Sequence, residues 1–484
     1  MSSLTLARWW RFLPADEWRS LRLAVFLLGS ALLVLAASGV LDTALFAQQS
    51  NTKYLVCVMG AATVTLLVTI RAPMRFLLFI AILVAPFDFV FTFQGLQPTP
   101  LLAVDVVALC VALPRRPRST ASLAPAAAAL PLLLLPAIIG STDPGYWFVW
   151  LGVTLASGYL AFLVAREDGG PTLIAIALTV AAFVQGALAV WEFKTGHQLN
   201  LYQASASTAT SDEYFFTYGS VFRPSGATPD PIGLGQVLAL CIPMTVALSA
   251  SLRRRIWALA AVAMAGVAAL GLALSLSRMS LVGGWVGLVV TLALLPKRVR
   301  IRTILFVAAA TALVVLMAFG IAPQALSKRI SSIFDPTAAH VSTSSGDLLR
   351  LHIWAAALRT IEANPLTGVG FGHLTQWLPK YGVAVNSASE AHDVYLQLFA
   401  EGGVLGIVAI LVMVYSYVRD LWRSFGPHRI WVAGAAGALV AQLLAWSTDF
   451  QIKYVQISAP VAVVFGLVAA LVDRPADAPA ERLL

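Results

Sequence analysis

Residues 231–250 read PIGLGQVLALCIPMTVALSA, a run of 20 residues without one charged side chain. An α-helix of about 20 predominantly apolar residues spans the hydrocarbon core of a bilayer, so this run predicts a membrane-spanning helix. Working outward from it in both directions gives about fourteen runs of this kind. The candidate spans are 21–40, 54–70, 75–93, 98–113, 121–140, 145–165, 172–191, 231–250, 256–276, 279–295, 303–322, 396–417, 430–447 and 457–472.

The composition of the whole chain agrees with a polytopic membrane protein. Of its 484 residues, 59% are hydrophobic and 11% are charged, against about 45–50% and 25% in soluble domains. This balance excludes a soluble globular protein. Because no polar linker of domain size separates the runs, we expect one all-α integral membrane domain over residues 1–484. The three cysteines, Cys57, Cys110 and Cys241, lie inside apolar runs, where we expect free thiols.

The distribution of basic residues predicts the orientation of the chain. With the N-terminus in the cytoplasm, the cytoplasmic segments hold 22 of the 32 lysines and arginines. This bias is the one that the positive-inside rule describes, and it places both termini in the cytoplasm. The net charge of +9 is therefore a topology signal and a contact for anionic membrane lipids, and we expect no nucleic-acid partner. The first apolar run is too long for a signal-peptide core, so we expect it to stay attached.

Two predicted extracytoplasmic loops are long, at residues 192–230 and 323–395, and long loops in compact proteins are usually functional. The second contains a predicted helix over 347–362. Its apolar residues recur every three or four positions, which favours packing on the bundle or at the membrane interface. The glycines of Gly368-Val-Gly-Phe-Gly372 lack the strand and helix of a nucleotide-binding motif, and they predict a tight backbone turn.

His392 is the candidate proton acceptor. It ends the larger loop in Ser389-Glu-Ala-His-Asp393, just before a span, so it is expected at the membrane surface. An adjacent carboxylate would orient its ring and suit it to proton transfer near neutral pH. Glu390 and Asp393 are the flanking candidates for this role, and they are also rival bases. The alternative is an ordinary helix start with Asp393 in the first turn.

Three arginines are candidates for binding an anion. Arg278 lies in so short a link between two spans that its guanidinium must lie at membrane level, where a charge needs a partner. A phosphate or pyrophosphate suits planar, bidentate arginines, and snorkelling to lipid headgroups is the competing interpretation. Arg223 and Arg350, each taken alone, are more often solvated loop charges. No His, Cys, Asp or Glu spacing indicates a metal site, so we expect metal-free chemistry without a cofactor.

Together these residues resemble the O-antigen ligase and O-antigen polymerase superfamily of bacterial envelope membrane proteins. The matching motifs are Arg223-Pro-Ser-Gly226, Ser277-Arg278, Arg350-Leu-His-Ile-Trp354, Asn364-Pro-Leu-Thr-Gly368-Val-Gly370, and His392-Asp-Val-Tyr-Leu396 followed by Glu401-Gly-Gly-Val-Leu-Gly406. They cover roughly residues 220–410 in order, and the first two hundred residues match only as apolar spans. One departure is Asp393, because the family commonly has asparagine after the histidine.

The resemblance implies a bundle of the C-type glycosyltransferase kind and an inverting, metal-independent glycosyltransferase in the bacterial inner membrane. The donor would be a glycan on undecaprenyl pyrophosphate at the periplasmic face. Arg223, Arg278 and Arg350 would bind its pyrophosphate, and His392 would be the catalytic base.

The acceptor separates two alternatives that the sequence leaves open. A polymerase transfers glycan to a lipid-linked glycan, and a ligase transfers it to the lipid A core. A flippase or exporter with many spans, moving a lipid or polysaccharide, is the competing class; such carriers place charges at mid-membrane, whereas these candidates lie at one rim.

Overall fold

The computed structural model describes residues 74–85, 101, 105, 119–197, 217–218, 221–323, 327, 346–383 and 390–474. Outside these ranges lie the predicted spans 21–40 and 54–70, nearly all of 98–113, and the residues Cys57 and Cys110. Cys241 is a buried free thiol, as predicted.

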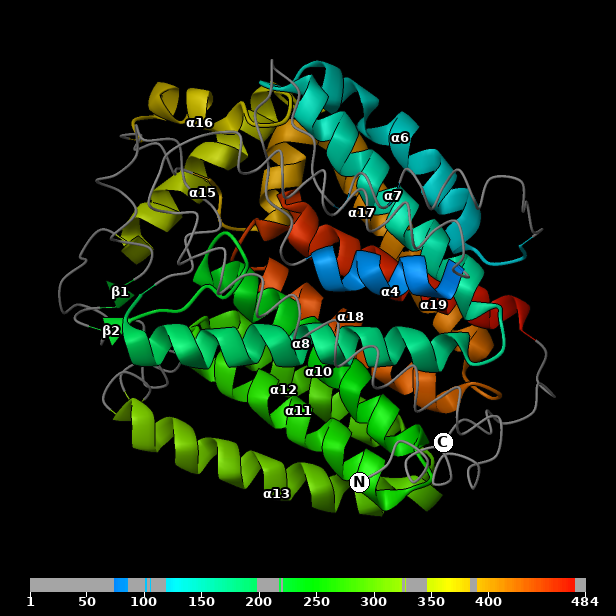
Figure 1. The fold of residues 1–484 in the computed structure, drawn as a ribbon. Helices are drawn as coiled ribbons and strands as arrows, with labels where there is room; N and C mark the ends of the chain where they lie inside the picture. The colour runs from blue at the N-terminus through cyan, green and yellow to red at the C-terminus, as the bar shows by residue number, and fades with distance from the viewer. Residues whose placement is uncertain are drawn as a thin grey trace, which may run out of the picture.

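The described chain is helical apart from one short hairpin (Figure 1). Its α-helices are α4 (Met74–Val84), α6 (Leu123–Ile139), α7 (Pro144–Ala165), α8 (Gly170–Thr195), α10 (Pro231–Ser251), α11 (Arg255–Leu274), α12 (Arg278–Leu294), α13 (Lys297–Ile321), α15 (Gly346–Ala363), α16 (Leu374–Trp377), α17 (Val394–Ser424), α18 (Arg429–Trp446) and α19 (Val455–Asp473). Strands β1 (Thr217–Tyr218) and β2 (Val221–Phe222) pair antiparallel, with Thr217 opposite Phe222.

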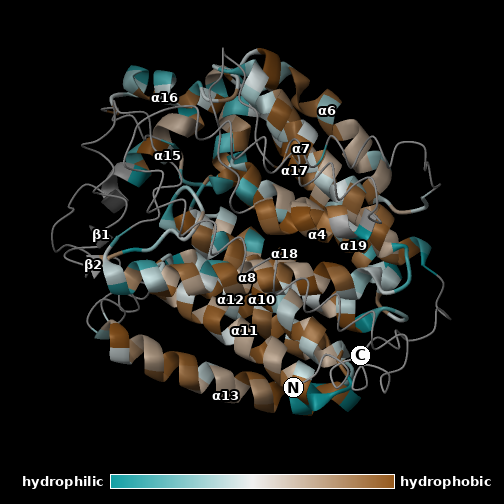
Figure 2. Ribbon diagram, viewed as in Figure 1, coloured by the Kyte–Doolittle hydropathy of each residue, from teal (hydrophilic) through white to brown (hydrophobic). Residues whose placement is uncertain are grey.

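Eight of the described helices are long and apolar enough to cross a membrane, namely α7, α8, α10, α11, α13, α17, α18 and α19. Two further apolar helices, α6 and α12, are shorter. All ten coincide with predicted spans, with ends that differ by up to seven residues. The protein is therefore a helical, multi-pass membrane protein. Figure 2 shows hydrophobic residues over most of these helices and hydrophilic residues near helix ends. The total of fourteen spans stays a prediction.

Helix α10 is the centre of the bundle and packs against α8, α11, α12 and α18. Pairs of small residues bring the helices close. A Cβ atom on Gly287 of α12 would lie 2.4 Å from the Gly437 carbonyl oxygen of α18, and one on Gly466 of α19 would lie 2.0 Å from the Gly158 carbonyl oxygen of α7. Small residues at such contacts let helix backbones approach closely, which drives packing where lipid replaces water.

Successive spanning helices run in opposite directions, so the connecting segments gather at two ends of the bundle (Figure 1). One end is rich in arginine, as the charge bias predicts. There Arg300 donates to the Leu295 carbonyl oxygen at 2.7 Å, Arg429 to that of Leu294 at 2.8 Å, and Arg302 to that of Leu252 at 3.2 Å. These carbonyls end α10 and α12, where the last helical carbonyls lack partners within the helix. The opposite end, called here the site end, holds residues 140–143, 221–230, 275–278, 390–393 and 447–454.

The predicted amphipathic helix is α15 (Figure 1). Ile353, Ala357 and Ile361 on one side of it are buried in a cluster with residues of α16 and α17, while Leu351 and Leu358 are 57% and 53% exposed. One face of α15 therefore lies on the bundle, which was one of the two expected locations.

The glycine-rich segment forms a tight turn, as predicted. Gly368, Gly370 and Gly372 all have positive φ, at 66°, 90° and 78°, a conformation that glycine adopts at little cost. The turn packs against a kink in α17 at Gly403, where φ is 61° and ψ is −157°. The Gly370 amide donates to the Glu401 carbonyl oxygen at 2.9 Å. This contact fixes the first two turns of α17, which begins at Val394, two residues after His392.

Candidate functional site

His392 is held by its sequence neighbours on both sides. The indole Nε1–H of Trp354 in α15 donates to the Ala391 carbonyl oxygen at 2.6 Å, and the Ala391 amide donates to Oε1 of Gln397 at 2.7 Å. On the other side, the Asp393 carboxylate accepts the Leu396 amide at 2.8 Å and caps α17. His392 itself has φ of 49°, which costs about 1–3 kcal/mol for a residue other than glycine and is typical of functional positions.

The carboxylate next to the His392 ring belongs to Asp449, between α18 and α19. Its Oδ1 lies 3.6 Å from His392 Nδ1, with the two side chains 3% and 19% exposed. The Phe450 amide also donates to Oδ1 at 2.9 Å. Burial alone would raise the pKa of Asp449, but the nearby His392 and Arg350 outweigh this effect and lower that pKa below its ordinary value. An ionised Asp449 can therefore hold the Nδ1–H tautomer of His392 and leave Nε2 to accept a proton.

Neither carboxylate predicted to orient His392 does so. Glu390 forms an ion pair with Lys453, and Asp393 is the N-cap of α17. Burial raises the pKa of Asp393, an effect that its bonds to the Leu396 and Tyr395 amides oppose. Asp393 thus belongs to the helix start, as the alternative expected, although it precedes the first turn as the N-cap. The sequence prediction of the orienting partner was wrong.

Arg223 is buried, with 8% of its surface exposed, so it is not a solvated loop charge. Its Nε donates to the Ser275 carbonyl oxygen at 3.0 Å, which joins the Arg223 loop to the link that carries Arg278. The loop is held from α8, where the buried Glu192 accepts the amides of Ser225 and Gly226 at 2.9 and 2.7 Å.

The three predicted arginines share one electrostatic environment. Burial lowers the pKa of Arg223 to about 10, Asp230 and Asp449 oppose that shift, and Arg350 and Arg278 add to it. Arg223 remains charged at neutral pH, beside two further cations. Backbone strain recurs here, since Leu276, two residues before Arg278, has φ of 55°. The structure therefore brings all four predicted residues to one place at the site end, while their roles stay predictions.

A polar cavity of about 450 Å³ lies beside the His392 loop. Polar groups on its wall include Asp143, Glu390, Gln397, Glu401, Lys453 and Gln456, and the aromatic residues are Tyr146, Trp147, Phe450 and Tyr454. It is thus bounded by the segments that carry His392 and Asp449.

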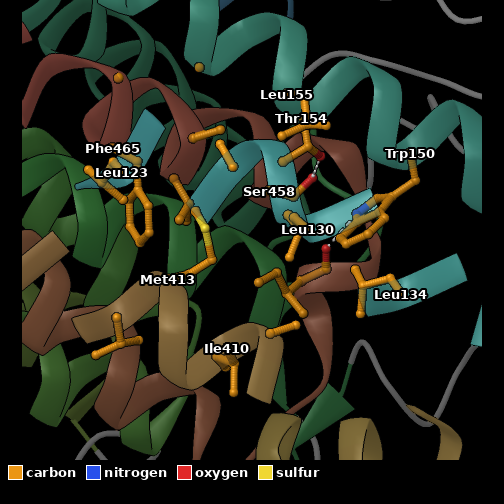
Figure 3. A pocket seen from close by; sticks show the side chains of 18 of the residues that line it. Leu123, Leu130, Leu134, Trp150, Thr154, Leu155, Ile410, Met413, Ser458 and Phe465 are labelled. Carbon is orange, nitrogen blue, oxygen red and sulfur yellow. Dashed lines mark hydrogen bonds between the residues drawn. The ribbon is translucent and has the colours of Figure 1, made fainter. Parts of the chain in front are cut away.

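A second cavity, of about 440 Å³, is apolar and lies between α6, α7, α17 and α19 (Figure 3). Leu130, Leu155 and Met413 are among its lining residues, and a hydrogen bond of 2.9 Å between the hydroxyls of Thr154 and Ser458 lies on its wall. It shares Trp147, Phe450 and Lys453 with the polar cavity. An apolar cavity between helices thus adjoins the polar one.

Sequence analysis did not identify three residues as parts of this site. Asp449 lies in a predicted outside link, Trp354 was considered only as part of a motif and an apolar face, and Glu192 is the first residue of the predicted loop 192–230. A buried acid at a span end was the available signal for Glu192. His197 and His352 are exposed, and Asp105, an acid within the apolar run 98–113, accepts a hydrogen bond from Ser157 of α7 at 3.0 Å.

Comparison with protein families gives one match. Residues 263–411 match the family model described as O-Antigen ligase. This range includes Arg278, Arg350, Trp354, His392 and Glu401, and it confirms the resemblance to the O-antigen ligase and O-antigen polymerase superfamily. No curated protein matches the chain.

Proposed function

We propose that this chain, with its O-antigen ligase domain at residues 263–411, is an inverting glycosyltransferase that moves a glycan from undecaprenyl pyrophosphate to an acceptor hydroxyl. The family supports ligase or polymerase activity on lipid-linked glycans. The observation that supports inverting transfer from undecaprenyl pyrophosphate is the His392–Asp449 pair, whose side chains lie 3.6 Å apart. This pair lies within the positive electrostatic field of Arg223, Arg278 and Arg350.

In the proposed reaction, the acceptor oxygen attacks the anomeric carbon of the donor sugar from the face opposite the pyrophosphate. The bond from that carbon to the pyrophosphate oxygen breaks, and undecaprenyl pyrophosphate leaves with the electron pair. His392 Nε2 takes the acceptor proton as the new bond forms, because a sugar hydroxyl is too weak an acid to ionise beforehand. Asp449 stabilises the resulting imidazolium. One inversion at the anomeric carbon follows.

The arginines would stabilise the leaving group. Departure of pyrophosphate develops negative charge, and fixed cations aimed at that charge lower the barrier most where water is scarce. Arg223 is buried and already desolvated, so it loses little hydration when it binds the anion. This charge stabilisation supports a metal-independent mechanism.

The location of the site supports the proposed orientation. The positive-inside rule assigns the arginine-rich end of the bundle to the cytoplasm. The candidate groups lie at the opposite end. We therefore place the protein in the bacterial inner membrane with its site facing the periplasm and its termini in the cytoplasm. Clustering at one end also favours transfer chemistry over the flippase or exporter, whose charges would line a path through the bundle.

Transfer by the purified protein in nanodiscs tests the proposal, with undecaprenyl pyrophosphate-linked glycan as donor and released undecaprenyl pyrophosphate as the readout. His392→Ala should slow transfer about a hundred- to ten-thousand-fold, as expected for loss of a general base, while donor binding persists. Arg278→Lys keeps the charge but loses bidentate geometry, so it should weaken donor binding. His352→Ala is the matched control, since His352 is exposed and lies two residues after Arg350 in sequence. Full activity of both His392→Ala and Arg278→Lys would refute the assignment.

A further inference from the structure

We propose that the polar cavity beside His392 binds a sugar ring of the acceptor, and that Glu401 is the residue that recognises it. The proposal rests on the proposed glycosyl transfer. It names the position from which the attacking hydroxyl is presented.

The position of the cavity favours the acceptor over the donor. Its wall includes Glu390, two residues before His392, and Phe450, which follows Asp449 in sequence. None of the three arginines lines it. Pro229, in the loop that carries Arg223, also lines it. A sugar held here would therefore contact the segments that carry the proposed base without contacting the arginines.

The lining has the chemistry of a sugar site. Sugars present hydroxyl groups around the ring edge and C–H groups on the ring faces, so they bind where polar side chains and aromatic rings line the same space. Tyr146 and Tyr454 supply partly exposed rings, and Gln397 and Gln456 supply amides. Lys453 is already paired with Glu390, so no cation on this wall is left for an anionic sugar. The cavity therefore favours neutral or amino sugars over uronic acids.

Glu401 has a carboxyl oxygen available for this ligand. It is 1% exposed, and its Oε1 accepts the amides of Gly372 and Leu374 at 3.0 and 3.2 Å. Its Oε2 is buried and makes no hydrogen bond of ordinary geometry within the described part of the chain, with the Gln397 amide beside the carboxyl group. A buried polar atom without a full partner is costly, and a sugar hydroxyl or amide would satisfy it.

Asp420 on the same helix provides a matched control. It is also fully buried and also accepts two backbone amides, those of Ser122 and Leu123, each at 2.8 Å. It uses one carboxyl oxygen for each amide, whereas Glu401 uses one oxygen for both. Asp420 does not line the polar cavity. The two residues therefore share the role of accepting backbone amides, and the proposed recognition of sugar belongs to Glu401 alone.

Saturation-transfer NMR on the full chain in nanodiscs tests sugar binding without turnover. Methyl β-glucoside and methyl β-glucosaminide should bind, and methyl β-glucuronide should bind about tenfold more weakly or worse. Glu401→Gln keeps an oxygen for the Gly372 and Leu374 amides but replaces Oε2 by an NH2 group that cannot accept a hydrogen bond, so it should weaken glucoside binding about tenfold. Asp420→Asn should leave it unchanged. Equal binding by the parent and Glu401→Gln, or an equal loss in Asp420→Asn, would overturn the role of Glu401.

A competition experiment separates the acceptor from the donor. Undecaprenyl pyrophosphate N-acetylglucosamine carries its sugar next to the pyrophosphate, so it would place that sugar in the donor position. Glucoside should stay bound in its presence, and displacement would assign the cavity to the donor sugar and overturn the acceptor assignment. Because neither measurement needs turnover, failure of glycosyl transfer itself would appear separately, in the activity assay.

Discussion

Asp449→Asn tests the proposed catalytic pair most directly, because the substitution removes one charge and keeps the shape of the side chain. At the observed 3.6 Å between Nδ1 and Oδ1, and with an effective dielectric constant of about 20, the attraction between Asp449 and a protonated His392 is about 5 kcal/mol. If the proton is half transferred in the transition state, about half of this attraction is lost there. The expected fall in rate is about 50-fold, rising to about 2,000-fold for complete transfer.

Single-turnover transfer with the purified protein measures this rate without interference from product release, and a separate binding measurement gives donor affinity. Donor binding should not weaken, because Asp449 partly neutralises Arg223 and Arg350 and its removal leaves that field more positive. Asp393→Asn is the control: asparagine also caps helices, so its rate should stay within about threefold of the parent. A rate for Asp449→Asn within about twofold of the parent would refute the pairing, as would a loss confined to donor binding.

The same residue predicts an effect of pH on stability. Because the pKa of Asp449 is lower in the folded protein than its ordinary value, its stabilising contribution is present above about pH 4. That contribution is lost as the pH falls through the folded pKa. Thermal unfolding in detergent between pH 3 and 6 should therefore show a smaller acid-induced loss for Asp449→Asn than for the parent. Equal losses would contradict the shift.

Three further substitutions test how the site is held. Trp354→Phe keeps an aromatic ring but loses the 2.6 Å indole hydrogen bond, so the transfer rate should fall several-fold while thermal stability drops by about 1 kcal/mol; an unchanged rate would show that this bond does not position the base. Glu390→Gln should destabilise the protein by about 3 kcal/mol, because it leaves the largely buried Lys453 without its partner. A second substitution that neutralises Lys453 should restore most of this stability, and no recovery would contradict the ion pair. Gly370→Ala places a Cβ atom 1.9 Å from a backbone oxygen and should lower the free energy of unfolding by more than about 4 kcal/mol. The control Gly382→Ala, also at positive φ but in open space, should lower it by about 1–2 kcal/mol. Equal effects in thermal unfolding would refute the close packing of the turn.

Spans were predictable from the sequence because apolar runs of bilayer length form helices whatever their neighbours. The turn at Gly368–Gly372 was also predictable, since alternating glycines without a flanking strand indicate special backbone angles. These features depend on local sequence and on the solvent that surrounds the chain.

Partners across the bundle were not predictable in the same way. Asp449 is 57 positions from His392, and only the packing of α17, α18 and α19 brings the two side chains together. The flanking acids Glu390 and Asp393 were the nearest candidates in sequence, but a lysine from another segment and the amides of a helix start already bind them. The burial of Arg223 was missed for a related reason: its cover comes from the link before Arg278 and from α8, which are distant in sequence.

The arginines at the far end of the bundle have a second effect on how the chain enters the membrane. Arg300, Arg302 and Arg429 contribute to the charge bias that directs insertion, and in the finished fold the same guanidinium groups bind carbonyls at the ends of α10 and α12. A helical hairpin inserted in the opposite orientation would lose these hydrogen bonds and leave carbonyl groups at helix ends without donors near lipid. Orientation is thus selected twice, first when the nascent chain is threaded and again when the helices assemble. A chain inserted in the wrong orientation would therefore be less stable than one inserted correctly.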